Sequence, residues 1–504
     1  MKIFCTILLF TLLYISVLNS KTLYVSTSGL DTNPGTFDLP FNTITKALAA
    51  SILPSDTILV RGGVYTLTST ITINTSISGK QDTLCHLFAY PGERPLLDFT
   101  TQSYGSKGLQ IKAKYWYVKG FDIKGAGDNG IYISGSFNIV EFCTMFENRD
   151  SGMQLSGGAN NNKVINCDSY WNMDPSEGNS DGFSPKLDVG TNNYFFGCRS
   201  FQNTDDGFDG YLRPSNNITT TLDNCWSFMN GYHKDFTVSV PGNGNGFKMG
   251  GSDLKNLEHN FILYNCLSFD NKAKGFDQNN NKGSMTLINC TGYRNGAKNY
   301  SVVLALDSGK VLTVTNCLVY GVMGTLLSNA VLTTNSWMRP DSVTRADFVS
   351  LDTAGVRGAR KPDGSLPDVT FMHLASGSSL IDAGTIIPGR PYAGSAPDLG
   401  CFEFGLVSDL KNEVNHKVGY YLSNNYPNPF NPSTEIAYQI PSSSHVTITI
   451  YNILGKVVET LVNEDKSAGT YYVKFNAANL ASGIYFYSLK TDNYVQTKKM
   501  ILMK

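Results

Sequence analysis

Five charged residues near the middle of the sequence have the types and spacing that could support chemistry. Asp181 and Asp206 each begin an Asp-Gly-Phe phrase, Asp205 and Asp209 flank the second phrase, and Lys248 ends a related phrase, Asn245-Gly246-Phe247-Lys248. Carboxylates that lie close together raise one another's pKa unless a cation compensates them. Ca²⁺ binds several oxygen ligands with loose geometry, so it suits these aspartates better than Mg²⁺. The alternatives are a solvated acidic face and aspartates that cap turns.

Lys248 could serve as a base beside such a cation. A dry groove and a nearby divalent cation both disfavour the ammonium form, which would leave an amine able to accept a proton. A free charge on Asp209 would oppose this, whereas a metal ligand has its charge already compensated. Without the aspartates, Lys248 would be interpreted as a surface lysine.

These residues come together only if the chain repeats, and two phrases recur at a spacing of 20 to 50 residues. Asn-Cys-x-Ser or a near variant begins at Asn166, Asn224, Asn265, Asn289 and Asn316. A Gly-apolar phrase recurs at 130–131, 152–153, 182–183, 207–208, 246–247 and 275–276. Short alternating segments broken by Asn, Gly and Asp lie between these phrases, without helical periodicity. The pattern predicts an all-β fold, a right-handed parallel β-helix whose core forms by stacking of coils.

If the Gly-apolar phrases are in register, Asp181 and Asp206 share one column in adjacent coils, about 4.8 Å apart. Residues three positions on also align, which places Lys248 one coil from Asp209. Phe183, Phe208, Phe247 and Phe276 then form an apolar column in the core. The step from Asp206 to Asn245 is longer than the others and implies an excursion of the chain.

Asparagines and cysteines follow the same repeat. The abundant asparagines between 151 and 300 suit tight turns that stack their amides from coil to coil. Seven cysteines from Cys143 to Cys317 recur at similar intervals, and five of them directly follow an asparagine, which is typical of small hydrophobes buried in a repeat. The chain has no C-x-x-C pair, so we do not expect these thiols to bind metal. The segment 45–51 is the most helix-like part of the mature chain and could cover the first coil.

Residues 166–212 (NCDSYWNMDPSEGNSDGFSPKLDVGTNNYFFGCRSFQNTDDGFDGYL) and 244–251 (GNGFKMGG) together resemble the pectate lyases of polysaccharide lyase family nine. The resemblance spans about residues 22–405. It implies calcium ligands at Asp181, Asp205, Asp206 and Asp209 and a catalytic base at Lys248. One departure is Pro185, which removes a backbone donor close to the first Asp-Gly-Phe phrase and could shorten the local strand.

The resemblance implies β-elimination on an acidic plant polysaccharide, pectate (homogalacturonan), to give 4,5-unsaturated oligogalacturonates. Calcium would neutralise the uronate carboxylate, and a neutral Lys248 would remove the C5 proton, which favours activity at alkaline pH. Lys186, Arg213, Lys234 and Arg294 could bind neighbouring uronates, but the sequence does not place them.

Two other functions stay open on the sequence. A glycoside hydrolase on the same fold would use two carboxylates, and Asn203-Thr204-Asp205-Asp206 superficially resembles polygalacturonase motifs. The Gly-His-Gly and Arg-Ile-Lys segments of those enzymes are absent, however. A non-catalytic polysaccharide-binding β-helix that keeps calcium for its structure is the second alternative.

The two ends of the chain predict export. Residues 1–20 combine Lys2, an apolar run and a small residue, as a secretory signal peptide does. We predict the β-helix domain at 21–405, a linker at 406–420 and a small β-sandwich at 421–504. The last segment resembles the C-terminal sorting domain of the type nine secretion system. Secretion, or attachment to the outer-membrane surface, follows from this resemblance, with the secretion machinery as a partner.

The composition narrows the possible partners. The chain has 504 residues, with 40 Lys and Arg against 41 Asp and Glu, so its formal charge is −1. Such a balance argues against nucleic acid as a partner. We expect a monomer, because a capped solenoid has no free end to pair.

Overall fold

The computed structural model describes residues 20–50, 52–405, 421–422, 425, 428–440, 444–466, 469–492 and 494–503. The chain divides into two compact units, residues 1–409 and 410–504. The predicted signal peptide lies outside the described residues except for Ser20, and so does the whole predicted linker 406–420. The domain boundaries therefore stay predictions.

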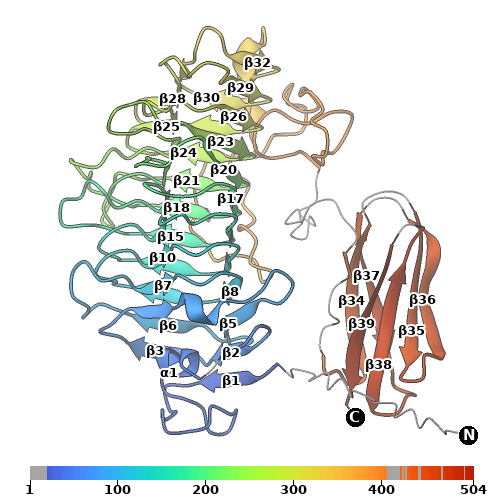
Figure 1. Ribbon diagram of the computed structural model, residues 1–504. Coiled ribbons are helices and arrows are strands. Elements are labelled where there is room, and N and C mark those ends of the chain that lie inside the picture. Colours follow the sequence, from blue (N-terminus) through green and yellow to red (C-terminus); the bar gives the residue numbers. More distant parts are fainter. Residues whose placement is uncertain are drawn as a thin grey trace, which may run out of the picture. The chain divides into compact units, whose positions relative to one another are not determined.

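The first unit contains three parallel sheets, which wind around one core as a right-handed β-helix (Figure 1). Sheet A contains β1 (Thr22–Val25), β2 (Thr57–Val60), β5 (Cys85–Ala89), β8 (Trp116–Lys119), β11 (Ile139–Glu141), β14 (Lys163–Ile165), β17 (Asn193–Phe196), β20 (Ile218–Asp223), β23 (His259–Tyr264), β26 (Met285–Ile288), β29 (Leu312–Thr315) and β32 (Val331–Thr333). Sheet B contains β3 (Gly63–Thr66), β6 (Pro95–Asp98), β9 (Asp122–Lys124), β12 (Thr144–Phe146), β15 (Asp168–Tyr170), β18 (Arg199–Phe201), β21 (Trp226–Phe228), β24 (Leu267–Phe269), β27 (Thr291–Tyr293) and β30 (Leu318–Tyr320). Sheet C contains β4 (Ile71–Ile73), β7 (Leu109–Ile111), β10 (Ile131–Ile133), β13 (Met153–Leu155), β16 (Phe183–Pro185), β19 (Phe208–Asp209), β22 (Phe247–Lys248), β25 (Lys274–Asp277), β28 (Lys298–Ser301) and β31 (Gly324–Thr325).

The register predicted from the Gly-apolar phrases is confirmed. Phe183 pairs with Phe208, Phe208 with Phe247, and Phe247 with Phe276 across successive strands of sheet C. Their rings stack inside the coil with centroids 5.0 to 5.1 Å apart. Because the side chains of a strand alternate between its two faces, this inward column fixes which neighbouring residues point outward.

The predicted asparagine stacking is confirmed as well. Side-chain amides donate from coil to coil along Asn148, Asn172, Asn203, Asn230, Asn271 and Asn295, at 2.8 to 3.0 Å. All six side chains are buried, so each amide supplies the hydrogen bond that water cannot provide to the amide of the next coil. The nine cysteines from Cys85 to Cys401 are free thiols, and eight of them are buried, including the seven from Cys143 to Cys317 for which burial was predicted.

A short helix and the segment after the last coil cover parts of the solenoid. The predicted first-coil helix is α1 (Ile44–Leu48), whose buried Ile44, Ala47 and Leu48 join the core. Three short 3₁₀ helices complete the unit: η1 (Thr75–Ile77), η2 (Ser336–Met338) and η3 (Arg345–Asp347). After β32 the chain packs apolar side chains such as Phe371 and Leu374 against outward residues of sheet B, including Phe228 and Phe269.

The second unit is a β-sandwich, as predicted. One antiparallel sheet contains β33 (Tyr421–Leu422), β34 (Ser433–Ile440) and β37 (Gly469–Asn476), and the other contains β35 (Ser444–Asn452), β36 (Val457–Lys466), β38 (Gly483–Lys490) and β39 (Val495–Leu502). Side chains from both sheets share one core, among them Ile436, Phe475, Ile448 and Tyr487.

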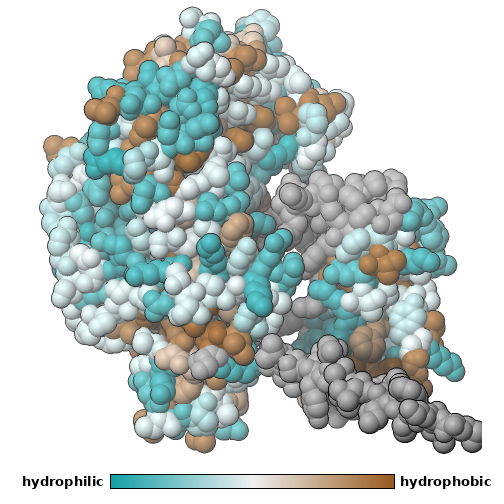
Figure 2. All heavy atoms as spheres, viewed as in Figure 1, coloured by the Kyte–Doolittle hydropathy of each residue, from teal (hydrophilic) through white to brown (hydrophobic). Residues whose placement is uncertain are grey.

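The visible surface of the first unit is largely hydrophilic, with hydrophobic residues scattered among the polar ones (Figure 2). In the described part of the chain, no helix combines the length and the apolar character that a membrane crossing requires.

Candidate metal and base site on sheet C

The charged residues singled out in the sequence meet at sheet C. Asp181 and Asp206 each stand two residues before a strand, β16 and β19 respectively, while Asp209 ends β19 and Lys248 ends β22. Asp209 and Lys248 are direct partners in the parallel register. The coil stacking therefore places an acid and a lysine side by side, although 39 residues separate them in the chain.

The glycine of each Asp-Gly-Phe phrase lets two coils approach closely. A Cβ atom on Gly207 would lie 1.9 Å from Ser227 Oγ and 2.6 Å from the carbonyl oxygen of Gly246. Glycine is thus required at this position, directly after the aspartate.

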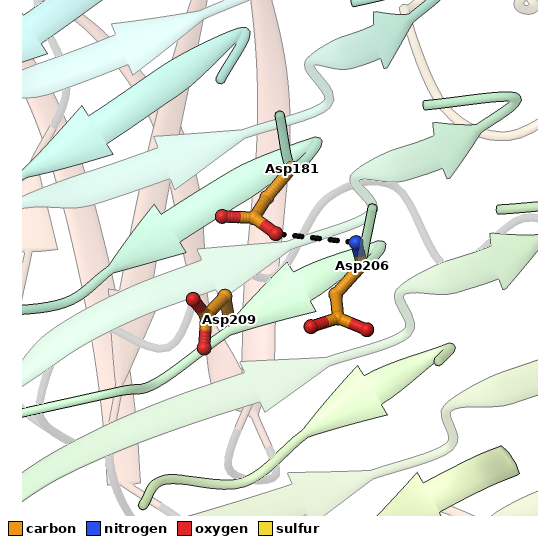
Figure 3. Close-up of side chains that lie close together, drawn as sticks. All are labelled: Asp181, Asp206 and Asp209. Carbon is orange, nitrogen blue, oxygen red and sulfur yellow. Dashed lines mark hydrogen bonds between the residues drawn. The ribbon is translucent and has the colours of Figure 1, made fainter. Parts of the chain in front are cut away.

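Asp181, Asp206 and Asp209 form a buried group in which each residue offers one oxygen, all within 4.8 Å of one another (Figure 3). Hard carboxylate oxygens brought this close together by a rigid scaffold are the donors that Ca²⁺ prefers. The residues present therefore fit a hard divalent cation.

Asp181 and Asp206 also belong to a ladder that links four coils. Each side chain accepts a hydrogen bond from the backbone amide at the same position of the next coil: Ser151 Oγ from Asp181 at 3.1 Å, Asp181 Oδ1 from Asp206 at 3.2 Å, and Asp206 Oδ1 from Asn245 at 2.7 Å. Ser184 Oγ also donates to Asp181 Oδ2 at 2.8 Å. The carboxylates are therefore held in place by neutral donors as well as by charge.

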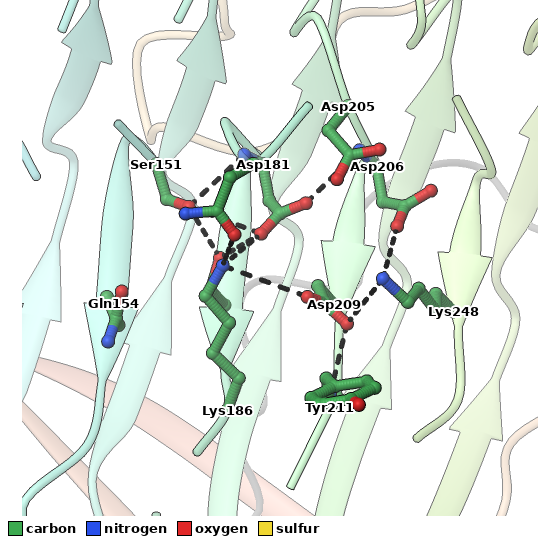
Figure 4. A network of polar contacts seen from close by, with 12 residues as sticks. Ser151, Gln154, Asp181, Lys186, Asp205, Asp206, Asp209, Tyr211 and Lys248 are labelled. Carbon is green, nitrogen blue, oxygen red and sulfur yellow. Dashed lines mark hydrogen bonds and ion pairs between the residues drawn. The ribbon is translucent and has the colours of Figure 1, made fainter. Parts of the chain in front are cut away.

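Two lysines neutralise part of the acidic group (Figure 4). Lys248 Nζ lies 3.0 Å from Asp206 Oδ2 and 3.3 Å from Asp209 Oδ1. Lys186 Nζ lies 2.7 Å from Asp181 Oδ2 and 3.8 Å from Asp209 Oδ2. Both lysines are buried, so these ion pairs are shielded from solvent screening.

Burial and mutual repulsion oppose ionisation of the acids. Burial raises the pKa of Asp206 to about 6, with Lys248 acting in the opposite direction. Burial raises the pKa of Asp181 too, and Lys186 opposes that rise. Burial disfavours the ammonium form of Lys248, but Asp206 and Asp209 outweigh it and raise the pKa of Lys248 well above its ordinary value. Without a bound cation, Lys248 is thus an ion-pair partner rather than a base.

Asp205 lies next to this group but outside the three residues that offer mutually close oxygens. Its Oδ1 accepts a hydrogen bond from the backbone N–H of Asn243 at 2.5 Å. Burial, together with the charges of Asp206 and Asp181, raises the pKa of Asp205 to about 9. Its predicted role as a ligand stays a prediction.

Among the further cations considered in the sequence, Lys186 lies inside the acidic group. Arg213 pairs with Asp253, Lys234 with Glu147, and Arg294 with Asp270. Lys234 and Arg294 approach residues that follow strands of sheet B, away from the acidic group. Pro185 still belongs to the three-residue strand β16, whereas the next strand, β19, is only two residues long.

Sequence reasoning did not assign the supporting residues Ser151 and Asn245. Both occupy the position of Asp181 and Asp206 in their own Gly-apolar phrases, so the aligned column contained the signal.

Comparison with known proteins agrees with this architecture. Residues 23–316 match the family described as Pel9A-like, right handed beta helix region, and residues 424–503 match the secretion system C-terminal sorting domain. Pectate lyase L of Dickeya chrysanthemi is 37% identical over 393 residues, covering 75% of this chain and 90% of that protein. Pectate lyase L of Paenibacillus polymyxa is 39% identical over 393 residues, which cover 73% of this chain and 85% of that protein.

Solved structures give the same result. The crystal structure of pectate lyase Pel9A aligns with a TM-score of 0.71 at 37% identity and covers 77% of this chain and 97% of that one. A rhamnogalacturonan lyase aligns with a TM-score of 0.60 at 26% identity, and the alignment covers 71% of this chain and 97% of that one. The sorting domain marks the protein for export, either into the medium or to the cell surface. The chain therefore belongs to the Pel9A-like β-helix family of polysaccharide lyases and carries a C-terminal sorting domain.

Proposed function

We propose that this protein is a calcium-dependent pectate lyase that cleaves polygalacturonate by β-elimination, with Lys248 as the base. The observation that carries the proposal is the register of sheet C, which sets Lys248 beside Asp209 at the edge of the buried acidic group. Family membership and the relatives named pectate lyase support the substrate class.

Asp181, Asp206 and Asp209 would hold the metal. We propose Asp205, the neighbour of Asp206 in the chain, as a fourth ligand on the family resemblance. When bound, calcium supplies Lewis-acid chemistry, because it neutralises the uronate carboxylate and makes the C5 hydrogen more acidic. The carboxylates are pre-positioned for this role by backbone and hydroxyl donors, so little rearrangement of the coils is needed.

The change in the state of Lys248 follows from the same contacts. Asp206 and Asp209 favour its ammonium form only while their charges are free. As metal ligands they no longer do so, and the amine can then take the C5 proton at Nζ. The electrons of the C5–H bond form the C4–C5 double bond, the C4–O bond breaks, and the leaving oxygen is protonated from solvent. The reaction leaves a 4,5-unsaturated sugar at the new non-reducing end.

The proposal is tested by ultraviolet absorbance of the full chain with polygalacturonate at alkaline pH, with added calcium and with chelator. We expect absorbance of the unsaturated product that requires calcium and vanishes in Lys248→Ala. New reducing ends without absorbance would instead indicate a hydrolase, and binding of polygalacturonate without either signal would indicate a binding protein. A parallel arm with rhamnogalacturonan is included because a rhamnogalacturonan lyase shares the fold at 26% identity.

For the C-terminal unit we propose recognition by the type nine secretion machinery, supported by the match over residues 424–503. We further propose a monomer with domains at 21–405 and 421–504. Mass determination of the exported protein would show whether the sorting domain is removed, and light scattering would report the oligomeric state.

A further inference from the structure

The long excursion before β22 forms a closed loop whose two ends touch. Gly231 and Gly244 lie so close that a Cβ atom on either would come within 2.8 Å of the other's Cα. Both have positive φ, 84° and 70°, which other residues rarely adopt. We call residues 231–244 the necked loop.

Lys272, from the next coil, closes this neck. Its backbone N–H donates to the carbonyl of Asn230 at 3.0 Å, and the following amide, that of Ala273, donates to the carbonyl of Gly244 at 2.9 Å. The aliphatic part of the Lys272 side chain packs on the two glycines, since a Cβ atom on either would meet Lys272 Cβ within 2.7 Å.

The ammonium group of Lys272 then binds the interior of the loop. Nζ donates to the carbonyl oxygens of Ser239 at 2.6 Å, Val240 at 3.2 Å and Gly242 at 2.6 Å. Three donors meet three carbonyl acceptors, which an ammonium can satisfy at once and a neutral apolar side chain cannot. Ser239 and Gly242 are buried, so removal of the ammonium would leave their carbonyl oxygens without this charged hydrogen-bond donor.

The other side of the necked loop contacts Asp205, and the residue that follows the loop contacts the acidic group. Directly after Gly242, the backbone N–H of Asn243 donates to Asp205 Oδ1 at 2.5 Å. One residue beyond the neck, the backbone and side-chain amides of Asn245 donate to Asp206 Oδ1 at 2.7 and 2.8 Å. The loop also contacts the segment that leads to Asp181, because Ser239 Oγ donates to the carbonyl of Glu177 at 3.1 Å.

We propose that Lys272 is a positioning residue for the calcium site, which it supports through the necked loop and the amides of Asn243 and Asn245. The inference rests on the proposed function only in naming calcium as the ligand. Lys272 touches backbone carbonyls and is not itself a ligand or a catalytic residue. The outer-shell partners of the aspartates are the amides of Asn243 and Asn245, and loss of such partners commonly weakens metal affinity by about 10- to 100-fold. Lys272 acts on these amides through the loop, so we expect the lower end of this range.

The test uses Lys272→Met in the full chain, which keeps the packing stem and removes the ammonium. The matched control is Lys282→Met, because Lys282 Nζ donates to one carbonyl, that of Ala305 at 2.8 Å, in a different loop. Calcium affinity is measured by titration calorimetry with the metal alone. Hydrogen exchange of peptides that cover residues 240–247 is measured in chelator.

For Lys272→Met we expect a calcium Kd about tenfold higher and faster exchange at Asn243 and Asn245. We also expect a turnover rate at saturating calcium that stays close to that of the wild type. The control variant should match the wild type in calcium Kd, exchange rate and turnover rate. Wild-type affinity in Lys272→Met, or a turnover loss that saturating calcium does not restore, would overturn the proposal.

If Lys272→Met does not fold, Lys272→Gln replaces it, since its amide keeps two donors but cannot satisfy all three carbonyls and carries no charge. A smaller rise in Kd with faster exchange is then expected, and an unchanged Kd would overturn the proposal. A wild-type protein that binds no calcium would refute the proposed calcium site instead, while the exchange data would still show whether Lys272 holds the loop.

Discussion

Replacing Lys248 by arginine separates its charge from its proposed ability to accept a proton. Lys248 is 7% exposed, with Nζ 3.0 Å from Asp206 Oδ2 and 3.3 Å from Asp209 Oδ1. A guanidinium keeps the positive charge between these acids, but its pKa above about 12 prevents it from acting as a base near neutral pH. We therefore expect Lys248→Arg to fold normally and to lose a factor of about 10²–10⁴ in rate.

Lys248→Met provides the contrasting variant. Two charges about 3 Å apart attract by roughly 5 kcal/mol at an effective dielectric constant of 20, before desolvation is subtracted. Removing one partner of a buried pair costs about 3–5 kcal/mol. We expect a loss of this size in the free energy of unfolding in chelator for the methionine variant, and a change below about 1 kcal/mol for the arginine variant. Calcium should stabilise the methionine variant more than the wild type, because a competing cation is gone.

The assay combines two readouts. All 4 tryptophans lie in residues 1–409, so tryptophan fluorescence during denaturant unfolding reports on the β-helix unit. Initial rates of absorbance increase with polygalacturonate at saturating calcium report on catalysis. A Lys248→Arg variant that retains more than about a tenth of the wild-type rate would refute Lys248 as the base, since a general base contributes at least about 10²-fold.

Three further predictions concern buried charged and titratable residues of the β-helix unit. Lys186→Met should lower stability in chelator and increase the stabilisation by calcium, measured as the shift in Tm, because Lys186 neutralises Asp181. Burial lowers the pKa of His259 to about 4, so the unfolded chain takes up this proton first as the pH falls below about 6.5. Stability should therefore fall by up to about 3 kcal/mol between pH 6.5 and 4, and denaturant unfolding of His259→Gln should lack this dependence. Arg360→Met should cost about 1.5–3 kcal/mol, because it removes charged hydrogen bonds to the buried Asp168, which lies 2.6 Å from Arg360 Nη2, while Arg199 stays paired with that carboxylate at 2.7 Å. Arg294→Met, which breaks the exposed pair with Asp270, is the control and should cost below about 1 kcal/mol.

The sequence was sufficient to predict the β-helix and the pairing of Asp209 with Lys248. In a parallel solenoid, coils pair residue by residue, so a recurring Gly-apolar phrase sets the register of every outward position. The same reasoning predicted the stacked phenylalanines and asparagines, because both depend only on their position within a coil.

The repeat pattern could not predict the contacts made by loops and by long flexible side chains. Lys186 follows β16, and the pattern does not say whether its side chain reaches the acids or solvent. The contact of Asn243 with Asp205 depends on the path of the necked loop, whose two ends meet through Lys272. Loop paths are set by such non-local contacts, which leave no periodic signal in the sequence.

The ladder on sheet C separates what the fold needs from what the chemistry needs. At one position of four successive coils, Ser151, Asp181, Asp206 and Asn245 each accept a backbone N–H from the coil that follows. A neutral hydroxyl or amide oxygen therefore satisfies the ladder at Ser151 and Asn245, so the fold requires an acceptor there and not a charge. The buried negative charges of Asp181 and Asp206 exceed this requirement, and burial opposes their ionisation. Costly buried charge beyond what the ladder requires is expected at functional sites, so these aspartates support the proposed cation site.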